Sequence, residues 1–181
     1  MVSGVAAGEK SFIRVLRERR SIRAFKRDAQ VDVNTLHKIL EICDLAPSSG
    51  GLQAFEIYQI KNEDVKKQLV RAANDQAFIS DAPLVLVFCA DASRSVERFG
   101  ERSKLFSVQD ATIVTAYAQL AVCALGLSAV WVGAFDENKV SKILKLPEHL
   151  RPVSMLPIGF PNEFPKEKTT RGSDSILHVI N

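Results

Sequence analysis

The chain has 181 residues, of which 46% are hydrophobic and 25% are charged. A chain of this length can enclose a substantial core, and the composition is ordinary for a globular protein, which excludes disorder as the default. The net charge of +3 comes without a long stripe of lysine and arginine, which argues against nucleic-acid binding. We expect residues 1–10 to form a flexible tail and residues 11–181 to form a single domain.

The first half of the chain alternates between helical and strand patterns. Apolar residues that recur every three or four positions predict helices, and short runs rich in aromatic and β-branched residues predict strands. Asp32 and Asn62 are suited to cap two of the helices, and Pro47 ends the first of these. The expected elements are helices over residues 11–20, 32–46 and 62–73, and strands over residues 55–60 and 84–89.

The second half contains the longest predicted helix. Residues 111–127 carry no charge, but they are few for a bilayer span and include polar side chains, so we expect a helix buried in a core or at a subunit interface. Before it, residues 91–107 break the regular pattern and fit either a surface connector or a cover over a substrate. Pro157 indicates a sheet edge or the end of a strand. The remaining expected elements are strands over residues 128–132 and 153–158 and a helix over residues 137–145 capped by Asp136.

The residues that could carry chemistry directly are few. The three histidines show no metal-ligand spacing, and the sequence lacks both a GxGxxG dinucleotide motif and a P-loop. Cys43, Cys89 and Cys123 are far apart in apolar surroundings, which favours buried free thiols in a reducing compartment. We therefore expect no metal site and no nucleophilic side chain.

The densest cluster of candidate binding groups is Glu18–Phe25, which places three guanidiniums and one hydroxyl within five residues. Arginine is always charged, and its planar fork suits phosphate and carboxylate oxygens. This octapeptide alone fits either a solvated basic turn or an anion-binding cradle. A loop of small polar residues and glycines, Leu45–Phe55, leads into the first strand. Binding groups without an acid, base or nucleophile indicate that a cofactor does the chemistry.

These blocks together resemble the FMN-dependent nitroreductase family. Arg19–Phe25 and Ala46–Gln53 resemble its two N-terminal signatures. The later blocks follow in the family's order: Ala82-Pro83 before a strand, Gln109-Asp110 opening the long helix, Gly126-Leu127 through Trp131-Val132-Gly133, and Pro157–Pro161 followed by Arg171. The resemblance covers about residues 11–175.

The resemblance implies an α+β fold with a central, mostly antiparallel sheet flanked by helices and a long buried central helix. It also implies an intertwined homodimer, with FMN at two sites built from both subunits. Arg19, Ser21 and Arg171 would surround the FMN phosphate and ribityl chain, and Arg23 would lie near flavin N1. The other implied cofactor-binding residues are Arg20 in the first signature, Gln53 in the second, Pro47, Ser48, Ser49 and Gly51 from the partner subunit, and Val132, Gly133 and Ala134 near the flavin ring.

The implied activity is that of a cytoplasmic FMN-dependent oxidoreductase that takes a hydride from NADH or NADPH. It would pass electrons to nitroaromatics, quinones or related small acceptors by ping-pong kinetics. Alternatives are a reductive dehalogenase, a flavin-fragmenting enzyme, or a flavin-binding protein with little turnover. Neither nucleic acid nor a membrane is an expected partner.

The chain departs from the family pattern in the second signature. Gly51 stands where the family often has asparagine, and Ala54-Phe55 replace Pro-Trp. Gly51 would therefore contact FMN through its backbone. Either Asn74 or Asp75 fits the position of the family's polar residue near the flavin ring.

Overall fold

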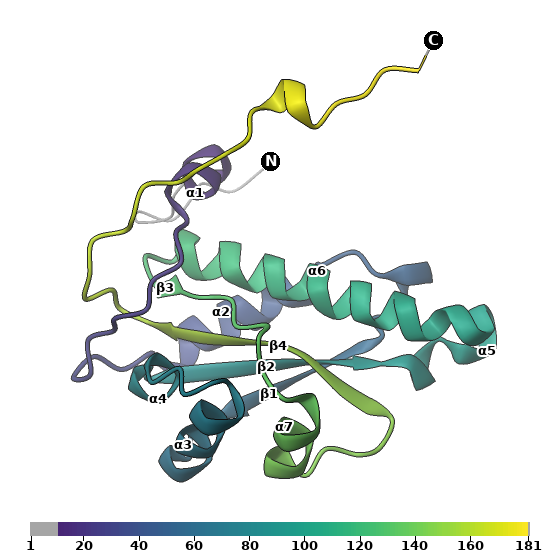
Figure 1. Ribbon diagram of the computed structural model, residues 1–181, viewed down its shortest axis with the longest axis horizontal. Coiled ribbons are helices and arrows are strands. Elements are labelled where there is room, and N and C mark those ends of the chain that lie inside the picture. The colour runs from purple at the N-terminus through teal and green to yellow at the C-terminus, as the bar shows by residue number, and fades with distance from the viewer. Residues whose placement is uncertain (1–10, 181) are drawn as a thin grey trace.

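The computed structural model describes residues 11–180. The predicted flexible tail, residues 1–10, lies outside this described part, as does Asn181. Figure 1 shows a central sheet with helices on both faces and a C-terminal arm that leaves the body.

The sheet has four antiparallel strands in the order β1-β2-β4-β3. Strand β2 lies inside the sheet and is buried along its whole length, as its continuous apolar run predicts. The strands are β1 (Phe55–Ile60), β2 (Leu84–Asp91), β3 (Ser128–Ala129) and β4 (Leu150–Gly159).

Helices cover the two faces of the sheet in separate groups (Figure 1). One face carries α2 (Val33–Asp44) and α6 (Ser103–Ala124), and the other carries α3 (Glu63–Ala72), α4 (Phe78–Asp81) and α7 (Glu137–Leu144). Successive strand side chains point to opposite faces, so β2 supplies both cores. Leu86 and Phe88 pack under α2 and α6, whereas Val85 and Val87 pack under α3 and α7. These features confirm the predicted α+β class.

Local capping signals set the starts of three helices. The side chains of Asp32, Asn62 and Asp136 each accept a hydrogen bond from a backbone N–H of the first helical turn, as predicted. The bonds that Asp32 accepts from Thr35 and those that Asp136 accepts from Lys139 lower the pKa of both carboxyls.

Three sequence-based expectations need correction. The long helix α6 begins at Ser103, so Gln109 and Asp110 lie in its second turn rather than at its opening. The strand expected over residues 128–132 is regular only at Ser128–Ala129, with one further bridge from Val132 to Met155. Pro157 lies within β4 and does not end it. The Pro157 carbonyl accepts a hydrogen bond from Val130 N. Because the nitrogen and the carbonyl of one strand residue point to the same side, the Pro157 nitrogen, which has no proton to donate, faces the irregular segment after β3 and not β2.

Residues 92–102 form short turns of helix before α6: a 3₁₀ turn (Ala92–Arg94), α5 (Val96–Phe99) and a second 3₁₀ turn (Gly100–Arg102). At the other end of the chain, residues 160–180 form the exposed arm, which contains one 3₁₀ turn (Ser173–Ser175). No helix in the described part of the chain is long and apolar enough to cross a membrane.

Candidate functional site

The arginine-rich segment lies along one edge of the sheet. Helix α1 (Phe12–Glu18) ends just before it, and the segment then runs beside β3, where Ile22 N donates to Ala129 O at 3.2 Å. Ile22 and Phe25 are buried in the core, whereas Ser21 and Arg23 are exposed. The apolar residues therefore anchor the segment, and its polar side chains point outward.

The outward-facing side chains share one hollow with the start of the C-terminal arm. Its lining contains five basic and two acidic side chains, which suits an anionic ligand. It is lined by Arg19, Arg20, Ser21, Arg23, Glu163, Lys166, Glu167, Lys168 and Thr169.

Arg20 has a structural partner of its own. Its guanidinium donates to the carbonyl of Arg17 and, at 3.1 Å, to that of Arg19. A cation on the last carbonyls of a helix satisfies acceptors that have no partner in the helix. Arg20 therefore caps α1 at the edge of the hollow.

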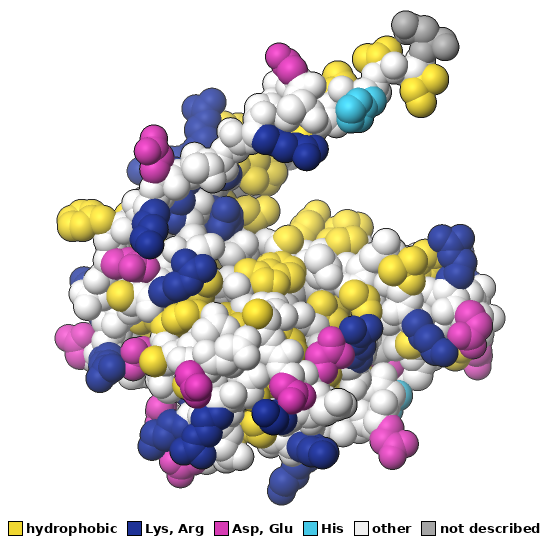
Figure 2. Space-filling view, viewed as in Figure 1, with side chains coloured by type: hydrophobic (Ala, Val, Ile, Leu, Met, Phe, Trp, Pro, Cys, Tyr) yellow, Lys and Arg dark blue, Asp and Glu magenta, His cyan; other side chains and the backbone are white. Residues whose placement is uncertain are grey.

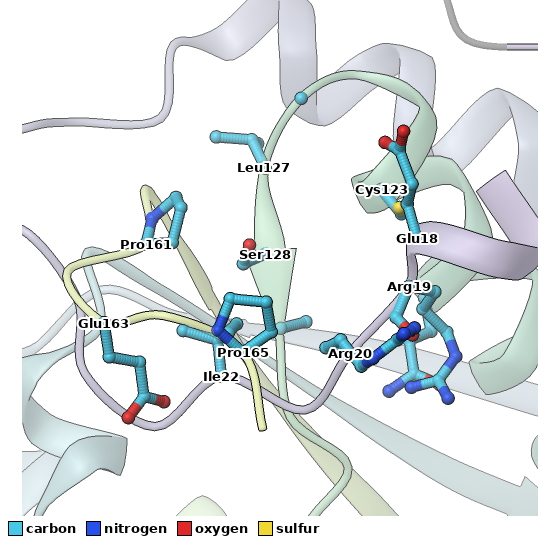
Figure 3. Close-up of a pocket in the computed structure, with 13 residues that line it drawn as sticks. Glu18, Arg19, Arg20, Ile22, Cys123, Leu127, Ser128, Pro161, Glu163 and Pro165 are labelled. Carbon is cyan, nitrogen blue, oxygen red and sulfur yellow. The ribbon is translucent and has the colours of Figure 1, made fainter. Parts of the chain in front are cut away.

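Glu163 ties the arm to the arginine segment. Its carboxylate accepts from the backbone N–H of Arg23 and, at 3.3 Å, from that of Ala24. Figure 3 shows Glu163 and Pro161 on one side of a neighbouring hollow, and Arg19 and Arg20 on the other. Sequence reasoning missed Glu163, because its partners are 140 and 139 residues away.

The second signature forms a tight loop with an unusual backbone. Gly50 and Gly51 have positive φ angles of 61° and 71°, and Gln53 reaches 47°. Gln53 N donates to Ser48 Oγ at 2.9 Å, and the Gln53 amide nitrogen donates to Asp44 Oδ1 at 2.9 Å. The amide nitrogen of Gln53 thus serves the loop itself.

Asp110 of α6 lies beneath this loop and was also missed as a site residue. Its side chain is buried and accepts from Ser49 N at 2.8 Å, from Ser49 Oγ at 3.0 Å and from Ala54 N at 3.3 Å. The loop and α6 line a second hollow, to which the predicted residues Pro47, Ser48 and Ser49 contribute.

A third group of predicted residues lies at the turn after β3. Val132 exchanges two backbone hydrogen bonds of 2.9 Å with Met155, and Gly133 and Ala134 are exposed. The carbonyl of Ala134 lies 3.4 Å from the side-chain amide nitrogen of Asn74. The structure therefore brings the side chain of Asn74 to this turn.

Arg23 lies near the same part of the fold. Its guanidinium carbon is 6.0 Å from the centre of the Phe78 ring at the start of α4. Phe78 and Phe135, the residue after Ala134, are partly buried and pack against the same core. Arg23, α4 and the 132–134 turn thus lie around one rim of the molecule.

The two signatures do not meet within one chain. The arginine segment lines the hollow beside the arm, whereas Pro47, Ser48 and Ser49 line the hollow beside α6. Arg171 lies on the exposed arm and lines neither. Within this chain, the two signatures therefore line separate hollows.

The segment before α6 rests on the second signature. Arg98 donates to the carbonyl of Gly50 at 3.2 Å, and Arg94 donates to that of Leu52 at 3.3 Å. Phe99 packs edge to face against Phe106 with ring centres 5.0 Å apart. These contacts attach residues 91–107 to the loop, and whether the segment covers a substrate stays a prediction.

Two of the three cysteines lie away from these hollows, whereas Cys123 lines the hollow of Figure 3. In the stretch from residue 11 to residue 180, no three His, Cys, Asp or Glu side chains are grouped as a metal site requires. Cys43 and Cys89 are buried free thiols, and burial raises the pKa of each to about 12. These two cysteines are therefore part of the core.

Comparison with known proteins agrees with this geometry. The model of the nitroreductase family matches residues 16–80 and 71–160. The chain belongs to the nitroreductase family. Similar proteins include an FMN reductase [NAD(P)H] of Bacillus subtilis, 31% identical over 180 residues that cover 92% of this chain and 72% of the relative. An oxygen-insensitive NADPH nitroreductase of Salmonella typhimurium is 29% identical over 174 residues, covering 92% and 72%.

A solved structure supports the family assignment. NfrA2 of B. megaterium superposes with a TM-score of 0.86 at 32% identity, covering 92% of this nitroreductase-family chain and 73% of that one. The family that the sequence blocks predicted is therefore confirmed.

Proposed function

We infer that this nitroreductase-family protein is an FMN-dependent NAD(P)H oxidoreductase. The observation that carries the inference is the arginine-lined hollow at the sheet edge, which lies at the position of the family's first signature. FMN, when bound, supplies hydride chemistry between a nicotinamide and an acceptor. The protein has to bind the cofactor, orient it and set its electrostatic surroundings.

The residues present fit this group. Arg19, Ser21 and Arg171 would hold the phosphate and ribityl chain, since guanidiniums and a hydroxyl are suited to a dianion. Arg20 would add positive charge near the phosphate while its guanidinium caps α1. Arg23 would lie near flavin N1, where a cation stabilises the negative charge of the reduced ring.

The ring end of the site would be formed by the turn after β3. Val132, Gly133 and Ala134 offer backbone groups there, and the exposed position of the last two leaves them accessible. The geometry favours Asn74 over Asp75 as the polar neighbour of the flavin, because the Asn74 amide reaches Ala134. Backbone groups and an amide fix the ring without adding a reactive side chain.

The complete site would require a homodimer, with Pro47, Ser48, Ser49, Gly51 and Gln53 coming from the partner subunit. The separation of the two signatures into different hollows supports this arrangement. The exposed arm supports it too, because an intertwined dimer would cover its apolar side chains: Phe164, Ile176, Leu177, Val179 and Ile180.

The outer surface of α6 also favours a dimer. An apolar hollow there is lined by residues of α1, α2 and α6, and Figure 2 shows hydrophobic side chains gathered over this part of the body, below the arm. Leu105 of α6 is 53% exposed and Phe12 of α1 is 67% exposed. Such a surface is expected to be covered in an obligate interface, which is larger and more apolar than a transient contact.

We place this single FMN-binding domain, residues 11–181, in the cytoplasm, where its three buried free cysteines would stay reduced. Nitroaromatics and quinones are the proposed acceptors. A dehalogenase, a flavin-fragmenting enzyme and a low-turnover flavin protein remain alternatives.

The first test is a titration of the purified protein with FMN and with riboflavin, followed by flavin fluorescence. We expect FMN to bind more tightly, because riboflavin lacks the phosphate that the arginines would hold. Equal affinity would contradict the phosphate site. NADH and NADPH oxidation with and without a quinone then separates an enzyme from a binding protein.

The second test is the mass of the flavin-loaded protein by light scattering at low micromolar concentration. We expect a dimer. A monomer that still holds FMN would contradict the shared site, because all the ligands proposed to come from the partner subunit would be missing from it.

A further inference from the structure

We propose that Asp110 is a positioning residue of the flavin site, because its buried carboxylate fixes the loop of residues 48–54 in the shape that meets FMN. The inference rests on the proposed function, since it takes this loop to face the flavin of the partner subunit. Asp110 would act through the loop and would not touch the cofactor.

The geometry around Asp110 is that of an anchor. Its side chain is 1% exposed, and its two oxygens accept three hydrogen bonds, all from the loop. Two come from Ser49, near the start of the loop, and one comes from Ala54 N, at its end. A buried carboxylate costs a large desolvation free energy unless it is hydrogen-bonded, so the loop and Asp110 depend on each other.

The loop needs such an anchor because its backbone is strained. Gly50 and Gly51 adopt positive φ angles without a Cβ clash, but Gln53 has a side chain at φ 47°. A residue other than glycine in this region persists only when its surroundings hold it there. Asp110 holds the loop on both sides of these three residues.

Asp110 also determines what the two serine hydroxyls can offer a ligand. The Ser49 hydroxyl donates its only proton to Asp110 Oδ1. The Ser48 hydroxyl accepts from Gln53 N at 2.9 Å, so its own proton remains available for a ligand. Ser48 is therefore the hydroxyl donor that this loop presents to the oxygens of FMN, and Ser49 is the link to the anchor.

Helix α6 provides a matched control. Thr115, five residues after Asp110, is fully buried, donates to Ala111 O at 2.6 Å and lies 2.8 Å from Ser154 Oγ. Thr115→Val keeps the shape of the side chain and removes a buried polar contact to the sheet, away from the loop. It should reduce global stability without altering residues 48–54.

The experiment is an FMN titration of the wild type, Asp110→Asn and Thr115→Val, well below the melting temperature of each protein. In Asp110→Asn the side-chain amide has only one accepting oxygen. Its NH₂ group would therefore face either the Ser49 donors or the backbone N–H of Ala54. We expect FMN to bind about tenfold more weakly, or worse, to Asp110→Asn and within about twofold of wild type to Thr115→Val. At saturating FMN, the visible circular dichroism of the bound flavin should change only in Asp110→Asn.

The outcomes separate the two levels of inference. A wild-type protein that binds no FMN overturns the proposed function. A wild type that binds FMN, with Asp110→Asn unchanged or both variants weakened equally, overturns the positioning role alone. If Asp110→Asn does not accumulate as folded protein, Ser49→Ala replaces it. That variant should bind FMN more weakly than wild type but more tightly than Ser48→Ala, and any other order overturns the inference.

Discussion

Replacing Arg23 separates its proposed electrostatic role from phosphate binding. Arg23 lies at the rim near Phe78 and the 132–134 turn, and its side chain is exposed. Arg171, on the arm, would act at the phosphate end. Arg23→Ala should therefore change the redox properties of bound FMN, whereas Arg171→Ala should change its affinity.

The expected size of the Arg23 effect follows from Coulomb's law. Two unit charges about 5 Å apart interact by about 3 kcal/mol at an effective dielectric constant near 20, and by about 0.8 kcal/mol in bulk water. Because Arg23 is exposed, we expect about 1–2 kcal/mol. For a two-electron couple, loss of this interaction free energy in Arg23→Ala should lower the reduction potential of the flavin by about 20–45 mV.

The Arg171 effect should be an affinity effect. A hydrogen bond to a charged group contributes about 1.5–3 kcal/mol, so Arg171→Ala should weaken FMN binding by about ten- to a hundredfold. The flavin that remains bound should keep a near-normal potential, because the lost charge lies far from the ring.

The assay is a redox titration of both variants at saturating FMN, together with stopped-flow reduction by NADPH and NADH. Arg23→Lys is the matched control, since it keeps the charge and should recover most of the potential. If Arg23→Ala leaves both potential and reduction rate unchanged, Arg23 does not lie beside flavin N1. If Arg23→Ala and Arg171→Ala both lose only affinity, both arginines serve the phosphate, and the electrostatic tuning is refuted.

Two further predictions concern groups outside the site. Cys43 and Cys89 should react with a thiol reagent at pH 8 only after denaturation, because burial raises the pKa of each thiol to about 12, and Cys123→Ser isolates their signal. The hydrogen bond from Arg151 lowers the pKa of Glu137 from its ordinary value of 4.5, so this ion pair stabilises the fold above that pH and is lost as the pH falls through the lowered value. Because both side chains are largely exposed, Glu137→Gln should cost at most about 1 kcal/mol of unfolding free energy at pH 7. Urea titrations should show that its difference from wild type disappears once the pH falls below the lowered pKa of Glu137.

The parts of the fold that sequence reasoning predicted are those set by nearby residues. Strand β1 matches its predicted limits, and three helices begin at their predicted caps, because an N-cap acts within one turn. The start of α6 was placed too late. Lys104 and the charged residues before it resemble a loop, and only packing against the core shows that Ser103 and Ser107 are buried helical positions.

The site was predicted to the extent that its residues are close in sequence. The arginine segment and the glycine loop are each local patterns, and both line hollows. Glu163 carries no comparable local signal, and Asp110 was recognised only as part of a family block before the uncharged stretch of residues 111–127. Each acts on a segment more than fifty residues away, and the sequence does not show which way either side chain points.

The loop of residues 48–54 and the arginine segment are held in different ways, which suggests different physical roles. The loop of residues 48–54 is held from inside the body by a buried carboxylate, so its shape is fixed before a ligand arrives. The arginine segment is held at its backbone by Glu163, while the Arg23 side chain stays exposed. A rigid loop is suited to orient a planar ring system, because misplacement of about 1 Å can slow a reaction strongly. The guanidiniums of this segment are suited to negative charge, at the phosphate for Arg19 and near flavin N1 for Arg23. A dimer would bring the loop of one subunit to the arginine segment and the 132–134 turn of the other, so that both subunits orient the cofactor and one of them supplies the charge compensation.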